Sequence, residues 1–261
     1  MIVIFDLFLF AELYEWSYCL PMLNNTLRRV RTAGRLSALG FACCLSAAVL
    51  NAQNVTEKVA EEMSEKSDKE MMKKVDWVNL FNGKDLTGWK NIYDHGEAKV
   101  VDGEIQLTGD KKFFLITENK YTDFELQLEV MLPEIGPANS GVMFRAQVDK
   151  TKPKHKVWGY QAECDPTPRA YSGRIYDEGR RKWALLTDEQ KELAENVQAP
   201  LGKWMTYRIV CKGDHIRVWV NGQLTSDLKD STDTEGVIGV QHHGEKGKTY
   251  SFRNIKLREL K

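Results

Sequence analysis

The side chains best suited to chemistry gather in residues 159–183, GYQAECDPTPRAYSGRIYDEGRRKW. Gln161, Glu163 and Asp165 stand at alternate positions, so an extended strand would place all three on one face. An amide beside two carboxylates can bind sugar hydroxyls, coordinate a hard cation such as calcium, or supply a proton. The other interpretation of this row is an edge strand with a polar outer face.

The second half of the same segment is predicted to form a loop over that face. Arg174, Tyr176 and Trp183 follow two prolines and a Tyr-Ser-Gly turn. Long loops in compact domains are disproportionately functional, although charged runs are more often ordinary solvated connections. We expect Tyr176 to be the functional side chain among them.

Further candidates come from two other strands. Arg145 lies in SGVMFRAQV, where alternation places it on the polar face, so it could hold a substrate oxygen or a developing enolate. A salt bridge to Glu163 is the alternative. Gln241 and His243 lie in QHHG, and an imidazole titrates near neutral pH, as a general base must. A core or turn histidine is the alternative for His243, and His155 is a weaker second candidate for the base.

The elements that position these residues are predicted to be short strands. FELQLEVML (124–132) alternates apolar and polar residues, and Asn221-Gly222 between two alternating runs is a strong hairpin signal. One short helix is expected after Thr187, where Thr-Asp-Glu-Gln has the form of a capping box. Many strands and few helices predict one all-β domain, a mostly antiparallel jelly-roll β-sandwich with one short helix in a loop, over residues 75–261.

The residues before this domain are predicted to be a leader and a tether. Arginines and then an apolar run precede Ala52, which indicates a signal peptide over 1–52 whose true start is Met22. A membrane anchor is the alternative, but each apolar run is shorter than the roughly 20 residues of a spanning helix. Residues 53–74 are rich in Glu and Lys and are predicted to be a solvated tether. The mature protein would then be periplasmic or secreted, with no membrane span.

The charge content narrows the class of binding partner, and the cysteine content bears on disulfide pairing and zinc binding. The formal net charge is +0, with 37 basic and 37 acidic side chains, which disfavours nucleic acid. Cys164 and Cys211 are the cysteines of the predicted mature chain, and their spacing leaves pairing open. A CxxC or CxxxH zinc pattern is absent from the sequence.

Seven ordered blocks make the chain resemble a known family. They are LFNGKDLTGW (80–89), NSGVMFR (139–145), GYQAECDP (159–166), SGRIYDEGRRKW (172–183), VNGQL (220–224), GVIGVQHHG (236–244) and FRNIKL (252–257). Over residues 76–261 the chain is similar to the 3-keto-disaccharide hydrolase domain family. The resemblance implies a concanavalin-like β-sandwich, exported by Gram-negative bacteria, that acts on glycosides oxidised to a ketone at C3. Where the family commonly has an acidic residue, this chain has His242, so no carboxylate role transfers to that position.

A 3-keto group acidifies the hydrogen at C2, so a base can remove it, the aglycone can leave from C1, and water can then add. This chemistry needs a base, a proton donor and a cation or metal for the enolate oxygen. The expected catalytic residues are His243, Glu163, Asp165 and Tyr176, and the expected substrate-binding residues are Arg145, Gln161, Arg174, Gln241 and Trp183. A divalent cation, calcium or another, is an open cofactor. A non-catalytic lectin-like sugar-binding module and a structural domain on a tether remain the alternative functions.

Overall fold

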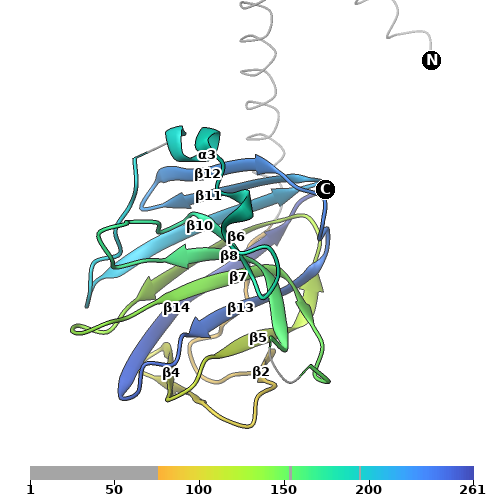
Figure 1. Ribbon diagram of the computed structural model, residues 1–261. Helices are drawn as coiled ribbons and strands as arrows, with labels where there is room; N and C mark the ends of the chain where they lie inside the picture. The colour runs from red at the N-terminus through yellow and green to blue at the C-terminus, as the bar shows by residue number, and fades with distance from the viewer. Residues whose placement is uncertain (1–75, 153–154, 194) are drawn as a thin grey trace, which may run out of the picture. The chain divides into compact units, whose positions relative to one another are not determined.

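Strands make up most of the part of the chain that the structure describes. The structure is a computed structural model that describes residues 76–152, 155–193 and 195–261. Two antiparallel sheets lie face to face in two layers (Figure 1). The predicted antiparallel sandwich is therefore confirmed. The predicted leader (1–52) and tether (53–74) lie outside the described residues.

The larger sheet has eight strands, and its hydrogen-bonded order is β12-β11-β10-β6-β14-β4-β3, with β1 pairing β14. Asn221 and Gly222 join two of them with φ of 50° and 82°, which is the predicted hairpin turn. The bounds are β1 Val78–Asn79, β3 Glu97–Val101, β4 Glu104–Gly109, β6 Phe124–Met131, β10 Trp204–Lys212, β11 His215–Val220, β12 Gln223–Lys229 and β14 Lys248–Glu259.

The smaller sheet has six strands in the order β2-β5-β13-β7-β8-β9. The bounds are β2 Trp89–Asn91, β5 Phe113–Tyr121, β7 Ser140–Val148, β8 Val157–Cys164, β9 Ile175–Glu178 and β13 Gly236–His242. Its central strands β13, β7 and β8 carry candidate site residues, so these strands set the spacing of the site.

The core lies between the sheets, because the alternation of apolar and polar residues turns one apolar face of each strand inward. Leu126 and Leu128 of β6 are buried there, as are Phe144 of β7 and Tyr160 of β8. The rings of Phe144 and Tyr160 stack with centroids 5.5 Å apart. Burial of this apolar surface stabilises the sandwich and leaves the outer face of each sheet for other uses.

The one α-helix among the described residues, α3 (Asp188–Glu192), begins where the capping sequence predicted. Thr187 accepts a hydrogen bond from the backbone N–H of Gln190. The Gln190 side chain bonds the backbone of Asp227 on β12 rather than closing a reciprocal capping box. A 3-10 turn, η1 (Trp183–Leu185), precedes it. None of the helices in the described residues is long and apolar enough to cross a membrane.

Register shifts interrupt five of the strand pairs, and those in β14 and β7 include residues with positive φ. In β14 the register shifts between Arg253 and Lys256, and Asn254 has φ 53°. In β7 the register shifts between Met143 and Gln147, and Arg145 has φ 45°. The second bulge redirects a side chain that the sequence placed in the site.

Candidate functional site

A pocket of about 220 Å³ lies on the outer face of the six-stranded sheet. Five neighbouring strands supply its walls or the residues that flank them, in the order β5-β13-β7-β8-β9. It is lined by Lys112, Asn139, Gln161, Glu163, Arg169, Tyr176, Glu178, Trp183, Gln241 and His243. The structure thus brings together six of the nine predicted residues: His243, Glu163, Tyr176, Gln161, Gln241 and Trp183.

Alternation along β8 explains why its polar side chains reach this pocket. Tyr160, Ala162 and Cys164 belong to the core between the sheets. Gln161 and Glu163 therefore project from the opposite face into the pocket.

A glycine in the strand next to β8 leaves room for these side chains. Gly141 of β7 pairs with Glu163, and a Cβ added at Gly141 would lie 2.5 Å from the Gln161 side chain. No other residue type fits this position without moving Gln161. The glycine of NSGVMFR, Gly141, is therefore the sequence feature that leaves this space open.

Glu163 is a carboxyl group held in nearly dry surroundings with a neutral partner. It is 5% exposed, and the Asn139 amide donates a 2.6 Å hydrogen bond to its Oε1. Burial raises the pKa of Glu163 to about 7, against the lowering effect of the Asn139 hydrogen bond. A carboxyl group with this pKa can both give and take a proton at neutral pH.

Two buried amide atoms in the pocket have no partner. Among the described residues, Gln161 Nε2 and Gln241 Oε1 make no hydrogen bond although both side chains are 1% exposed. An unsatisfied buried polar group costs about 1–3 kcal/mol, which a ligand carrying both a donor and an acceptor would recover. A sugar hydroxyl offers both functions in one group.

His243 is oriented by a carboxylate that the sequence did not indicate. Its Nδ1 lies 2.8 Å from Glu245 Oε1, and the Tyr250 hydroxyl donates a 2.6 Å bond to Glu245 Oε2. A carboxylate on Nδ1 favours the tautomer that leaves Nε2 as the proton acceptor. The His243 side chain is 47% exposed, so that nitrogen is open to a ligand.

The neighbouring histidine has a different environment. His242 is buried, stacks on Phe113 with centroids 5.5 Å apart and meets the Tyr250 ring edge-on at 4.8 Å. Burial lowers the pKa of His242, so it stays neutral. Of this pair of histidines, only His243 lines the pocket.

An aromatic wall closes one side of the pocket. The rings of Tyr176 and Trp183 meet edge-on with centroids 4.9 Å apart, and the Arg169 guanidinium lies 5.0 Å from the Trp183 ring. Burial raises the pKa of the Tyr176 phenol, so it stays protonated and can donate a hydrogen bond. Aromatic faces beside polar groups suit the mixed apolar and polar surface of a sugar ring.

Lys112 is a cation of this site that the sequence did not predict. Its Nζ lies 2.7 Å from Glu178 Oε1, and His155 Nδ1 lies 3.3 Å from the same oxygen. Glu178 is 5% exposed and Lys112 about one third exposed, so the ammonium borders the pocket. His155, the weaker candidate for the base, instead acts as a partner of Glu178.

The expectation that Arg145 lies in the site is wrong. Its side chain is fully buried and donates to the carbonyl oxygens of Thr122 and Gly213, each at 2.8 Å, and to Asp123. The salt bridge to Glu163 that stood as the alternative is not formed either. The bulge and the left-handed backbone at Arg145 end the regular alternation, so its side chain joins two turns of the sandwich.

Asp165 is also turned away from the pocket. Strand β8 ends at Cys164, and the Asp165 carboxylate accepts bonds from the backbone N–H of Thr167 and from Arg169 Nε, at 2.9 and 2.8 Å. Burial raises its pKa, but these hydrogen bonds outweigh that effect and hold the pKa of Asp165 below its ordinary value. It is a turn residue that fixes Arg169.

Arg174 is the third predicted residue outside the pocket. It is 1% exposed and donates to the carbonyl oxygen of Thr225 at 2.5 Å and to the backbone of Gln190. It therefore joins the α3 segment to β12 and does not meet a substrate. Arg174 immediately precedes the short strand β9, and sequence alone could not show which side it takes.

The remaining candidate groups are the cysteine thiols and the side chains that could bind a metal. Cys164 and Cys211 are both buried and free. Within the described residues no group of three or more His, Cys, Asp and Glu side chains is placed to hold a metal ion. The side chains of the pocket thus give no ligand set through which a metal-dependent step can be derived.

Comparison with known proteins identifies the family of the chain and agrees with its fold. The model of the 3-keto-alpha-glucoside-1,2-lyase-like domain matches residues 76–258. A search of curated proteins finds no match. A solved structure from Parabacteroides distasonis, described as a candidate glycosyl hydrolase, has a TM-score of 0.51 at 23% identity and covers 74% of this chain and 97% of its own.

Two Bacillus subtilis structures are also similar. The carbohydrate-binding module CBM66 has a TM-score of 0.48 at 18% identity, covering 66% of this chain and 96% of its own. A protein of unknown function with a galectin-like fold has a TM-score of 0.44 at 17% identity, covering 70% of this chain and 94% of its own.

Proposed function

Because the chain belongs to the 3-keto-α-glucoside-1,2-lyase-like domain family, we propose that it cleaves glycosides oxidised to a ketone at C3 of the sugar. The reaction is elimination across C1 and C2 followed by hydration, which together give net glycoside hydrolysis. The observation that carries the proposal is the convergence of Glu163 and His243, two proton-exchanging groups, on one small pocket.

The elimination begins with proton removal. His243 Nε2 takes the hydrogen from C2, and the electron pair moves into the C2–C3 bond and onto the ketone oxygen as an enolate. Glu245 on Nδ1 stabilises the imidazolium that forms. His243 keeps the role that the sequence predicted for it, now with a named orienting partner.

A cation is needed where the enolate charge develops. With Arg145 away from the site, Lys112 and Arg169 are the cationic side chains that line the pocket. We assign the enolate oxygen to Lys112, because it lines the pocket and its ammonium is held 2.7 Å from Glu178 Oε1. A positioned charge in a partly dry pocket stabilises an oxyanion more strongly than the same charge in water.

The leaving group then departs with a proton. The C1–O bond breaks as the enolate electrons return to form the enone, and the aglycone oxygen takes the proton of Glu163. Water adds at C1 of the enone, and the Glu163 carboxylate accepts its proton. The enolate that this addition forms takes a proton at C2 from the His243 imidazolium, so each cycle restores both groups. The pKa of about 7 suits Glu163 to this double use.

The other lining residues bind the sugar. The unpartnered Gln161 Nε2 and Gln241 Oε1 meet hydroxyl groups, and Tyr176 and Trp183 cover the apolar face of the ring. The volume of about 220 Å³ lies below the roughly 300–1,000 Å³ of sites that enclose drug-sized ligands. The pocket therefore encloses the oxidised sugar and leaves the aglycone outside.

Export of the protein is part of the same proposal. Its basis is the arginine-rich start and apolar run before Ala52, and it places the mature enzyme in the periplasm or outside the cell. Edman sequencing or mass spectrometry of the mature N-terminus would test it. A protein found intact from Met1 in the cytoplasm would refute this part.

The direct experiment follows aglycone release from several 3-keto glucosides by the purified full chain. We expect turnover, with a loss of about 100-fold or more in kcat/KM for Glu163→Gln and His243→Asn. Glu118→Gln, an exposed carboxylate on β5, is the matched control and keeps full activity. Parallel assays with a chelator and with added calcium test the divalent cation.

Two outcomes would overturn the assignment. No release from any substrate, with or without divalent metals, would refute the enzyme. Saccharide binding that persists in His243→Asn without turnover in the parent protein would instead support a non-catalytic binding module.

A further inference from the structure

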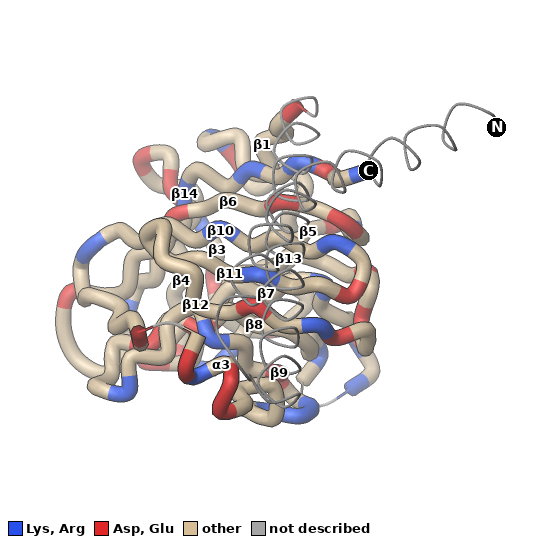
Figure 2. Tube along the Cα trace, turned by 90° about the horizontal axis from the view of Figure 1, so that it is seen from above, with Lys and Arg blue, Asp and Glu red and all other residues tan. Residues whose placement is uncertain are grey.

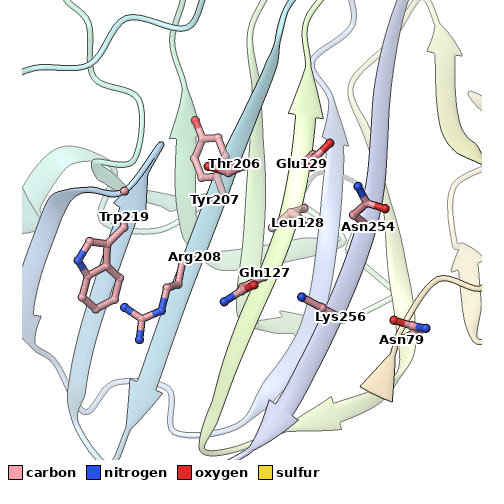
Figure 3. A pocket seen from close by; sticks show the side chains of 11 residues that line it. Asn79, Gln127, Leu128, Glu129, Thr206, Tyr207, Arg208, Trp219, Asn254 and Lys256 are labelled. Atoms are coloured by element: carbon pink, nitrogen blue, oxygen red, sulfur yellow. The ribbon is translucent and has the colours of Figure 1, made fainter. Parts of the chain in front are cut away.

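A groove of about 730 Å³ lies on the outer face of the eight-stranded sheet, in the other layer from the pocket. Figure 3 shows its side chains crossing neighbouring strands from Trp219 to Asn79. It is lined by Asn79, Gln127, Leu128, Glu129, Thr206, Tyr207, Arg208, Trp219, Gly222, Asn254 and Lys256. Strands lie about 4.8 Å apart, so the span from β11 to β14 is about 15 Å. An extended chain fits this length better than a single sugar ring.

Stacked cations and indoles border the groove. Arg208 lies 4.1 Å from the Trp219 ring, and Lys256 lies 4.9 Å from the Trp77 ring. Figure 3 shows the Arg208 side chain beside the Trp219 indole at one end. Stacking holds long cationic side chains in fixed positions, so less conformational entropy is lost when they bind a ligand.

The centre of the groove carries polar groups that can donate or accept hydrogen bonds. Figure 3 places Gln127 next to Lys256 and Asn254 near Glu129. Gln127 and Lys256 are half-buried, and Asn254 is exposed. Amides beside a hydroxyl such as that of Thr206 can donate and accept, as sugar hydroxyls require.

The charged side chains that line the groove are Arg208, Lys256 and Glu129. Around it, Arg217, Arg253 and Arg258 lie among the carboxylates Asp227, Glu104 and Glu125. Glu125 pairs with Arg208 and Arg258, and Glu129 pairs with Arg253. In the part of the chain that the structure describes, no carboxylate lies within ion-pair distance of Arg217 or Lys256. Lys and Arg positions lie among Asp and Glu positions along the chain trace in Figure 2.

We propose that this groove binds a carboxylated polysaccharide, a chain containing uronic acid residues, with Lys256 pairing a sugar carboxylate while Gln127 and Asn254 bond the hydroxyls. Lys256, which has no carboxylate within ion-pair distance among the described residues, favours an acidic ligand, and the amides of Gln127 and Asn254 favour a hydroxylated one. Nucleic acid is a poorer match, because Glu129 lines the groove and the chain has no net positive charge. The groove would hold an acidic polymer on one face while the other face keeps its own site.

The test is isothermal titration of the full chain with a galacturonate oligomer and with a neutral gluco-oligomer of equal length. We expect binding of the acidic oligomer that weakens as salt rises, and binding of the neutral oligomer at least about fivefold weaker. Lys256→Gln should weaken acidic binding about tenfold and Gln127→Ala about threefold. Both side chains lie on the sheet surface, and thermal unfolding checks that each variant is folded.

Two controls separate this groove from the pocket. Lys99→Gln changes an exposed lysine on β3 of the same sheet and should leave binding within about twofold. Glu163→Gln, in the pocket, should also leave it unchanged. Loss in Glu163→Gln with no loss in Lys256→Gln would place the ligand in the pocket and overturn the proposal.

Three other results would also overturn it. They are no binding of the acidic oligomer, equal binding of the neutral oligomer, and tighter binding of a DNA duplex that Lys256→Gln abolishes. The outcome does not depend on activity toward 3-keto glycosides, so failure here and failure of the proposed enzyme are distinguishable.

Discussion

Glu163 and Glu125 occupy similar places on the two sheets, but their pKa values are shifted in opposite directions. Each lies on an inner strand of its sheet, and they are 5% and 2% exposed. Burial raises the pKa of both, but Glu163 has the neutral Asn139 as its partner and reaches about 7. Glu125 has Arg208 and Arg258, whose hydrogen bonds and charge outweigh burial and lower its pKa.

The difference shows that burial of a carboxylate does not by itself make a reactive group. A buried carboxylate between two guanidinium groups remains ionised and stabilises the fold. The same group beside an amide holds a proton up to near neutral pH, so it can exchange that proton with a ligand. In this sandwich the hydrogen-bonding partner of a buried carboxyl group, more than its degree of burial, decides whether the group is structural or reactive.

The largest expected effect is on activity at Glu163. Glu163→Gln keeps the hydrogen bond from Asn139 but removes the exchangeable proton, so kcat/KM for a 3-keto glucoside should fall about 100- to 1,000-fold. Steady-state kinetics at neutral pH measures this. Activity within threefold of the parent protein would remove Glu163 from the mechanism.

The next largest effect is on stability at Glu125. Glu125→Gln leaves two guanidinium groups without their carboxylate and should lower the free energy of unfolding by about 2–3 kcal/mol, since both remain partly hydrated. Urea unfolding measures this, and activity of the folded variant should be unchanged. Glu129→Gln is the matched control, because its partner Arg253 is about one third exposed and the loss should stay below about 1 kcal/mol.

Stability should also depend on pH in opposite directions for the two acids. The folded pKa of Glu163 is raised from 4.5 to about 7, so its ionisation lowers stability as pH rises between these values. Glu163→Gln should therefore raise the free energy of unfolding at about pH 8 by about 1–3 kcal/mol. The folded pKa of Glu125 is lowered, so its contribution is present above 4.5 and is lost as pH falls. A Glu163→Gln variant less stable than its parent at the higher pH would contradict this.

The smallest effect is expected from one methyl group at Gly141. Gly141→Ala would place Cβ 2.5 Å from the Gln161 side chain and displace it from the pocket. We expect kcat/KM to fall about tenfold while binding in the groove on the other sheet stays unchanged. Equal losses at both places would indicate general unfolding rather than a local change.

The sequence predicted the sandwich and most of the pocket for identifiable reasons. Alternation fixes which side of β8 carries Gln161 and Glu163, and the Asn221-Gly222 turn fixes a hairpin register. The family resemblance singled out His243, which periodicity alone does not distinguish from His242. These features are local, so they can be recognised in a single sequence.

The misses came from features that local patterns do not encode. Arg145 sits in a bulge with a positive φ, which ended the alternation that had placed it in the site. Lys112 meets Glu178 across 66 residues, and no pattern in the sequence joins them. Asp165 follows the end of its strand, where two-residue periodicity no longer applies. Tertiary contacts and strand ends, not composition, decided these positions.

The most direct measurement is a carbon-13 NMR titration of the glutamate carboxyl groups in the full chain, with Glu163 and Glu125 assigned through their Gln variants. It reports the proton on Glu163 without requiring the correct aglycone. We expect Glu163 to titrate at about 7 and Glu125 below 4.5. A Glu163 carboxyl that titrates at or below 4.5 would contradict its role as the proton donor.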